Sequence, residues 1–369
     1  SIALGDKSEQ LIEELVKQPD FSELAKRAGT AKVEQFEQLL NLLAAFREQK
    51  DLFIDQLAKD TKTLKGLAGT VSSASANNFQ DTANLLYSMG SRKVNLTGLV
   101  NYESLAEKAN EAGPDDIRGL TLLMARFDED HRNKLIPRVD WASLCMKCPI
   151  DVGLLRALGG CLENLWRKAE MLSDKSDFDK VAQYLRSRDD DIMQKIENAY
   201  EQAKMHRAPY ASLYAGVGKF LWNCNQIDHT LSLEIATKTM SKLIECFWIA
   251  PINYHYVGQL INALYKIDPY LSESFLGNNK VRGRIQQSIN EHDWSKEVEG
   301  LKHLIEAFYR SFPDLWRRMV NSNWIVVDLS SLDLDSIYRD VEEEKNAGTA
   351  YNTAKKVRAL RHSPKFLLC

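Results

Sequence analysis

The chain has 369 residues, of which 44% are hydrophobic and 27% are charged, so it can bury a large core. Its formal net charge of -3 gives no general attraction to nucleic acid or anionic lipid, and no apolar run reaches the roughly 18 residues that span a membrane. With only 9 Pro and 18 Gly, the chain is poor in turn formers, which disfavours a β-sandwich or barrel and favours long helices with short connections.

The chain start and the cysteines indicate the cellular setting. Residues 1–6 lack the basic and apolar regions of a signal peptide and lack an initiator Met, so we expect an excised fragment or a processed product, derived from a larger multidomain chain. Cys161, Cys224 and Cys246 lie within apolar helical patterns, which is typical of buried free thiols. We therefore expect a reducing, cytoplasmic location.

Helical periodicity begins early and then continues along most of the chain. Apolar residues recur at helical spacing in 33–46 and 79–89, a small and polar stretch at 69–78 predicts a loop, and 110–116 is a strong break. Further helices are predicted at 117–127, 151–172, 176–186, 190–205, 210–226, 230–246, 254–267, 270–276, 280–291 and 296–310. Residues 323–334 contain a β-favouring Ile-Val-Val core and predict a short extended segment, followed by an acidic and then a basic tail.

Three stretches in the C-terminal half resemble one another: 220–231, 260–271 and 304–315, at a spacing of about 40 residues. Each places apolar residues on one face of a helix, and the first two then have an Asp, Asp228 or Asp268, suited to cap the next helix. Gly218 and Gly258 occupy equivalent positions and would let neighbouring helices approach closely.

Weaker similarities extend the pattern upstream. Residues 84–89 resemble 262–267, residues 123–128 resemble 263–268, and 160–162 align with 218–220. The sequence therefore predicts an all-α fold, an α-solenoid of stacked antiparallel helix pairs of the HEAT or tetratricopeptide kind. The alternative is a non-repetitive bundle whose helices are similar only because all are amphipathic.

This pattern suggests three regions. They are a weakly repetitive helical segment at 1–113, a helical-repeat array at 114–322, and a C-terminal extension at 323–369.

No motif in the sequence specifies catalysis, a metal or a cofactor, and we expect none of the three. Cys145 and Cys148 form a CxxC without the second pair that a zinc site needs, so structural thiols are favoured over a redox pair. Residues 216–219 partly match a phosphate-binding loop, but no strand precedes them and Phe220 stands where Ser or Thr is required.

Position within the repeat suggests a binding surface instead. Aromatic and polar-tipped residues that share a position in the three copies, or lie at the junction between two copies, predict a site for a protein ligand: Asn225, Gln226, Trp248, Tyr254, His255, Tyr265, Lys266, Tyr309 and Arg310. Core packing is the alternative role for the junction aromatics. The basic tail has little aromatic interleaving, so nucleic acid is not an expected partner.

The units FLWNCNQIDHTL at 220–231 and LINALYKIDPYL at 260–271 resemble units in the C-terminal helical sensor arrays of bacterial STAND NTPases. The resemblance covers about residues 114–320 and lacks the NTPase module. It implies a sensor region that binds a trigger protein, as in family members that act in anti-phage defence, while another part of a longer chain binds and hydrolyses the nucleotide. A structural adaptor and an enzyme with a scattered site are the alternatives.

Overall fold

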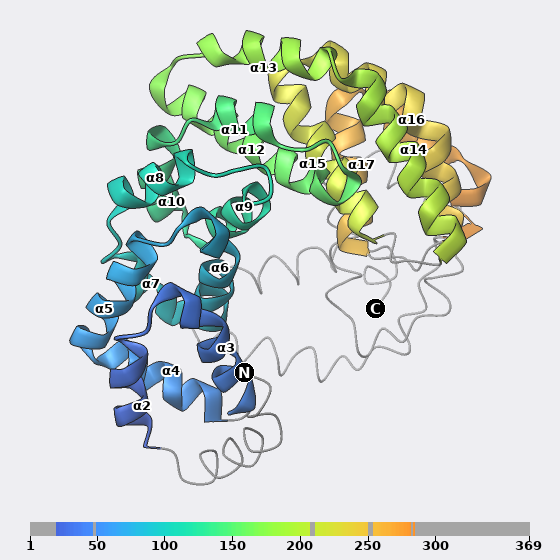
Figure 1. Cartoon of the computed structure of the whole chain (residues 1–369). Coiled ribbons are helices and arrows are strands. Elements are labelled where there is room, and N and C mark those ends of the chain that lie inside the picture. Colours follow the sequence, from blue (N-terminus) through green and yellow to red (C-terminus); the bar gives the residue numbers. More distant parts are fainter. Residues whose placement is uncertain (1–19, 47–48, 207–210, 250–253, 282, 285–369) are drawn as a thin grey trace, which may run out of the picture. The chain divides into compact units, whose positions relative to one another are not determined.

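The computed structural model describes residues 20–46, 49–206, 211–249, 254–281 and 283–284. Every regular element in these residues is a helix, and no strand occurs among them, which confirms the predicted all-α class (Figure 1). The predicted extended segment and the third copy of the repeat lie outside these residues.

The first half of the described chain contains short helices with tight connections. Their bounds are α2 (Phe21–Ala28), η2 (Val33–Gln35), α3 (Phe36–Ala45), α4 (Lys50–Lys59), α5 (Thr61–Ser72), η4 (Ala76–Asn78), α6 (Phe79–Ser88), η5 (Gly90–Arg92), α7 (Lys93–Thr97), α8 (Tyr102–Asn110) and α9 (Ile117–Arg126).

Longer helices follow in the second half. Their bounds are α10 (Glu129–Leu135), η6 (Ile136–Arg138), α11 (Trp141–Lys147), α12 (Val152–Leu172), α13 (Ser176–Arg186), α14 (Asp189–His206), α15 (Ala211–Ile227), α16 (His229–Ile249), α17 (Tyr254–Ile267) and α18 (Pro269–Gly277).

The chain divides into two compact units. Unit 1 comprises Ser1–Pro149 and Gly160–Val181, and unit 2 comprises Ile150–Gly159 and Ala182–Cys369. The predicted division at residue 113 lies inside unit 1, and the one at 323 lies beyond the described residues.

Unit 1 contains a row of three helices, in which α3 packs on α6 and α6 packs on α9 (Figure 1). Their first residues lie about 40 positions apart in the chain. A second row consists of α5, α8 and α10, in which α8 contacts both neighbours. Within each row, neighbouring helices thereby cover one another's apolar stripes.

The helices of the first row bury residues at the same relative positions. The buried side chains are Phe36, Leu43 and Phe46 in and just after α3, Phe79, Leu86 and Met89 in and just after α6, and Ile117, Met124 and Phe127 in and just after α9. This common register includes α3, whose sequence predicted a helix but no relation to the repeat.

Unit 2 repeats the arrangement with longer helices. Helix α15 packs along α17, while α16 contacts both α14 and α18. Val217 and Cys224 of α15 and Val257 and Leu264 of α17 are buried at the positions that correspond to Phe79 and Leu86 in unit 1. We call α3, α6 and α9 of unit 1, and α15 and α17 of unit 2, the first helices.

Glycines set the close approach of helices in unit 2. A Cβ atom on Gly218 of α15 would lie 3.0 Å from Cα of Leu260 in α17, and one on Gly159 of α12 would lie 2.9 Å from the backbone of Phe220 in α15. The partial phosphate-loop motif therefore lies inside a helix, where Gly218 allows the predicted contact between neighbouring copies.

Two sequence-based expectations about local structure differ from the fold. The predicted loop at 69–78 begins later, because α5 continues to Ser72, and the stretch between 128 and 150 contains α10, η6 and α11, for which no helix was predicted.

Candidate functional site

The predicted surface residues Asn225 and Lys266 lie together in unit 2. Asn225 near the end of α15 donates a hydrogen bond from Nδ2 to the backbone carbonyl of Lys266 near the end of α17, at 3.4 Å. Its Oδ1 atom accepts from Ser232 Oγ at 3.3 Å and lies 2.7 Å from His229 Nδ1. Asn225 therefore joins the ends of two first helices and the start of α16.

The other predicted surface residues divide into two groups. Gln226 and Tyr265 are half-buried and Lys266 is exposed, so the end of each first helix presents polar groups to solvent. Trp248 belongs to α16, and Tyr254 and His255 open α17, but their side chains lie outside the described part of the structure, as do Tyr309 and Arg310 entirely.

Unit 1 has a matching contact that the sequence did not assign. The guanidinium carbon of Arg126, at the end of α9, lies 4.3 Å from the ring centroid of Tyr87 near the end of α6. By the predicted similarity of 84–89 and 123–128 to the later copies, Tyr87 corresponds to Asn225 and Arg126 corresponds to Lys266. The sequence signal that could have found this contact was the same register, extended from the C-terminal half of the chain to α6 and α9.

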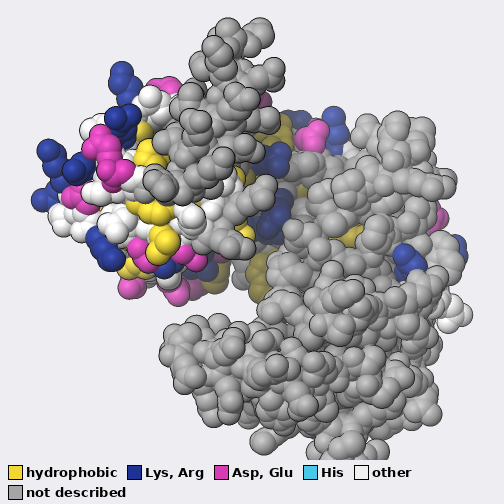
Figure 2. All heavy atoms as spheres, turned by 90° about the horizontal axis from the view of Figure 1, so that it is seen from below, with side chains coloured by type: hydrophobic (Ala, Val, Ile, Leu, Met, Phe, Trp, Pro, Cys, Tyr) yellow, Lys and Arg dark blue, Asp and Glu magenta, His cyan; other side chains and the backbone are white. Residues whose placement is uncertain are grey.

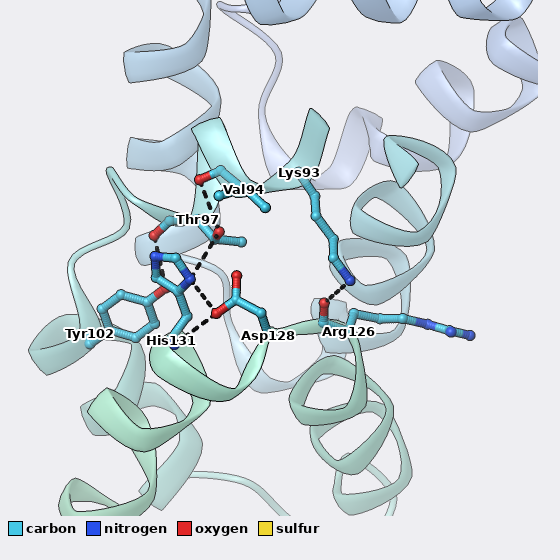
Figure 3. Close-up of polar contacts among 7 residues, drawn as sticks. All are labelled: Lys93, Val94, Thr97, Tyr102, Arg126, Asp128 and His131. Atoms are coloured by element: carbon cyan, nitrogen blue, oxygen red, sulfur yellow. Dashed lines mark hydrogen bonds and ion pairs between the residues drawn. The ribbon is translucent and has the colours of Figure 1, made fainter. Parts of the chain in front are cut away.

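A polar cluster in unit 1 secures the turn after α9 (Figure 3). Lys93 Nζ donates to the backbone carbonyl of Arg126, which would otherwise be an unpaired helix-end acceptor. Burial lowers the pKa of Lys93, and the charges of Arg126 and Arg132 act in the same direction while Asp128 opposes them.

Asp128 caps α10 and carries the other half of this cluster. Its Oδ1 accepts from the backbone N–H of His131 at 2.9 Å and lies 2.6 Å from His131 Nδ1 (Figure 3). Burial would raise the pKa of Asp128, but the hydrogen bonds from His131 and the charges of His131 and Lys93 outweigh it and lower the pKa.

The neighbours of His131 also use their polar atoms internally. Thr97 Oγ1 lies 3.5 Å from His131 Nδ1 and donates to the carbonyl of Val94, while the Tyr102 hydroxyl donates to the carbonyl of Thr97 at 2.8 Å. Burial, followed by the charge of Asp128, raises the pKa of that hydroxyl. These contacts tie the start of α10 to α7 and α8 and describe a structural junction.

Unit 2 has a corresponding cap that also forms an ion pair with an arginine. Asp228 accepts the backbone N–H of Leu231 at the start of α16, as its position in the sequence predicted. Both of its oxygens also accept from Arg186 at the end of α13, at 2.5 and 3.0 Å. Asp268 caps α18 by accepting from Tyr270, with Pro269 at the first helical position as predicted.

Cys145, Cys148, Cys161 and Cys224 are buried and form no disulfide, as predicted for Cys161 and Cys224, while the Cys246 side chain lies outside the described part of the structure. Cys145 and Cys148, the CxxC pair, are likewise buried and unpaired at the end of α11. Burial, and then the nearby Cys161, raise the pKa of the Cys148 thiol, which disfavours the reactive thiolate.

Charged side chains gather on one exposed part of unit 1. Figure 2 shows Lys and Arg side chains along one edge of the coloured surface, with acidic and hydrophobic side chains beside them. Exposed basic residues of α2, α4 and α5 are Lys26, Arg27, Lys59, Lys62 and Lys65. Arg27 pairs with Glu23 in its own helix, so part of this charge is already neutralised.

Metal-binding clusters and membrane-spanning helices are both absent from the described residues. No group of three or more His, Cys, Asp or Glu side chains there is placed to hold a metal ion. None of the helices in the same residues combines the length and apolar character needed to cross a bilayer.

Comparison with known proteins gives no assignment. None of the protein-family models matches the sequence, and no curated protein matches it either.

Proposed function

We propose that the chain is a non-catalytic recognition module, a helical-repeat array that binds a protein ligand along the ends of its first helices. The observation that carries the proposal is the repeated contact between these ends: Tyr87 with Arg126 in unit 1 and Asn225 with Lys266 in unit 2. Equivalent residues thereby form a row within each unit. An extended row of this kind is how stacked helical repeats contact partners.

The buried register of the first helices supports the repeat on which this proposal depends. Five first helices that the structure describes bury apolar residues at matching positions, from Phe36 and Leu43 in α3 to Val257 and Leu264 in α17. Within each unit, these helices also start about 40 residues apart and contact their neighbours, which amphipathicity alone does not require.

The side chains on this row suit protein recognition. Tyr87 is 66% exposed, Trp222 on α15 is partly exposed, and Lys266 is exposed at the end of α17. Aromatic and cationic residues are the usual anchors of protein interfaces, because they combine apolar area with directed polar groups.

The wider setting is part of the same proposal. The resemblance to STAND sensor arrays suggests a trigger protein as ligand, a cytoplasmic location, and an NTPase module elsewhere in a longer chain. Cys161 and Cys224 are buried and form no disulfide, which is compatible with the reducing location.

A capture experiment tests the proposal. The tagged chain and its Tyr265→Ala/Lys266→Glu variant are used to capture proteins from infected and uninfected bacterial lysates. We expect one protein to be retained in stoichiometric amount by the unchanged chain and to be reduced at least about tenfold with the variant, which is about 1.4 kcal/mol.

Lys280→Glu provides a control, because it makes the same charge change at an exposed position beyond α18. Thermal unfolding of all three proteins verifies that they are folded. Equal capture by the unchanged chain and the double variant, or no specific partner in either lysate, would contradict the proposal.

A further inference from the structure

Tyr87 and Arg126 form an exposed aromatic–guanidinium pair on unit 1. The Tyr87 ring projects from the last turn of α6, and the Arg126 guanidinium covers one of its faces at 4.3 Å. With 66% of Tyr87 exposed, the ring retains a large apolar area in contact with water. Stacking also restricts the guanidinium to one orientation.

The charge of Arg126 is not neutralised by any carboxylate in the described residues. Neighbouring arginines are already paired: Arg92 with Asp55 at 2.6 Å, and Arg132 with Glu163 at 3.7 Å. In Figure 3 the Arg126 side chain extends away from Asp128, whose carboxylate is occupied by His131. The N–H edge of Arg126 is therefore available to an external acceptor.

The surroundings favour an anionic group that carries apolar surface beside it. Lys93 lies close enough to donate to the carbonyl of Arg126, so a second cation adjoins the pair. Val94, the next residue in α7, is 49% exposed, and Leu52 of the contacting helix α4 is exposed as well. Lys93 and Val94 thus supply a positive charge and an exposed apolar side chain at consecutive positions of α7.

We propose that Tyr87 and Arg126 dock an acidic segment of a partner protein. A carboxylate of that segment pairs in bidentate fashion with the guanidinium edge, and an adjacent apolar side chain packs on the open part of the Tyr87 ring. This inference rests on the proposed recognition function, since it names the chemistry of the ligand at one end of the row.

Selection from a random peptide library on the full chain provides the probe. We expect the selected peptides to be enriched in Asp or Glu next to an apolar residue. Fluorescence anisotropy then measures binding of the strongest peptide and of its analogue in which each Glu and Asp is replaced by the amide. We expect the amide analogue to bind at least about tenfold more weakly.

Variants of the chain assign the binding to this pair. Arg126→Gln and Tyr87→Ala should each weaken the acidic peptide at least about tenfold, whereas Tyr87→Phe keeps the ring and should retain binding. Arg118→Gln, an exposed position in the same helix α9, should leave binding unchanged. Circular dichroism confirms that each variant keeps its helical content.

Several outcomes would overturn the inference. They are a library that yields no binding peptide, peptides without acidic enrichment, affinities insensitive to Arg126→Gln, or a single-stranded oligonucleotide that binds more tightly than the peptide through Arg126. If lysate capture succeeds and Tyr265/Lys266 matter while Arg126 does not, the recognition function stands and this docking site fails. If no partner is captured but the acidic peptide binds through Arg126, the docking site for acidic peptides stands and the proposed recognition function fails.

Discussion

The carboxylate of Asp228 connects two helices of unit 2 through one buried group. Its side chain is 5% exposed and accepts from the Leu231 backbone and from two nitrogens of Arg186. Burial alone would raise the pKa of Asp228, but the hydrogen bonds from Arg186 and Leu231 and the charge of Arg186 lower it. The residue acts both as the cap of α16 and as the partner that fixes the end of α13.

We expect Asp228→Ala to lower the free energy of unfolding by about 2 kcal/mol, because it removes a helix cap and the two charge-assisted hydrogen bonds from Arg186. Asp228→Asn keeps an oxygen for the cap and should cost less. Asp268→Ala removes a cap without such an ion pair and should cost about 1 kcal/mol. Urea unfolding followed by circular dichroism measures the three values.

The pH dependence gives the same prediction a second test. Because the folded-state pKa of Asp228 lies below its unfolded value of about 3.9, its charge stabilises the fold above that value and ceases to do so as the pH falls through the folded pKa. The difference between the unchanged chain and Asp228→Asn should therefore be largest near pH 7 and shrink toward pH 3. A difference that stays constant or grows in acid would contradict this role.

Helix α5 shows how contact between elements depends on single positions. A Cβ atom on Gly66 would lie 1.9 Å from the carbonyl oxygen of Gly29, which follows α2, whereas one on Gly69 would meet nothing within 4 Å. The two glycines lie one turn apart in one helix, but only Gly66 faces another helix at backbone distance.

We expect Gly66→Ala and Gly69→Ala to change stability in opposite directions. The first forces α2 and α5 apart and should destabilise the chain by about 3 kcal/mol. The second removes backbone freedom from the unfolded chain at an exposed helical position and should stabilise it by about 0.5–1 kcal/mol. Differential scanning calorimetry distinguishes them, and destabilisation of similar size by both would show that the helix contact is not as described.

Local patterns predicted the elements whose apolar residues repeat at helical spacing. Periodicity was enough for α6 and α13, since each has a clear buried stripe and marked ends. The end of α5 was missed because Gly69, Thr70 and Ser72 have low helix propensity, yet Val71 is fully buried and tertiary packing keeps the turn helical. Short α10 was missed because Leu135 is its one buried side chain among polar neighbours.

Only part of the candidate surface could be predicted from the sequence. The register placed Asn225 and Lys266 at related positions, but their hydrogen bond requires the lateral packing of α15 on α17. The contact between Tyr87 and Arg126 is even harder to predict from local sequence, because it joins residues of two different helices, α6 and α9. Such contacts depend on how neighbouring helices pack, which periodicity within one helix does not specify.

At the scale of the whole molecule, the two units share one construction. Each contains first helices that bury the same register positions, and each brings the ends of neighbouring first helices together. Because these ends carry the aromatic, amide and cationic side chains, we propose that they bind the partner and that the helices of the second row in unit 1 and α16 in unit 2 support them.

Hydrogen–deuterium exchange of the full chain with and without its captured partner tests this assignment most directly. We expect the partner to protect amides around 84–90, 122–128, 222–228 and 262–268, where the first helices end, and to leave α5, α8 and α16 unchanged. Protection confined to the second helices, with none at the ends of the first helices, would contradict the account.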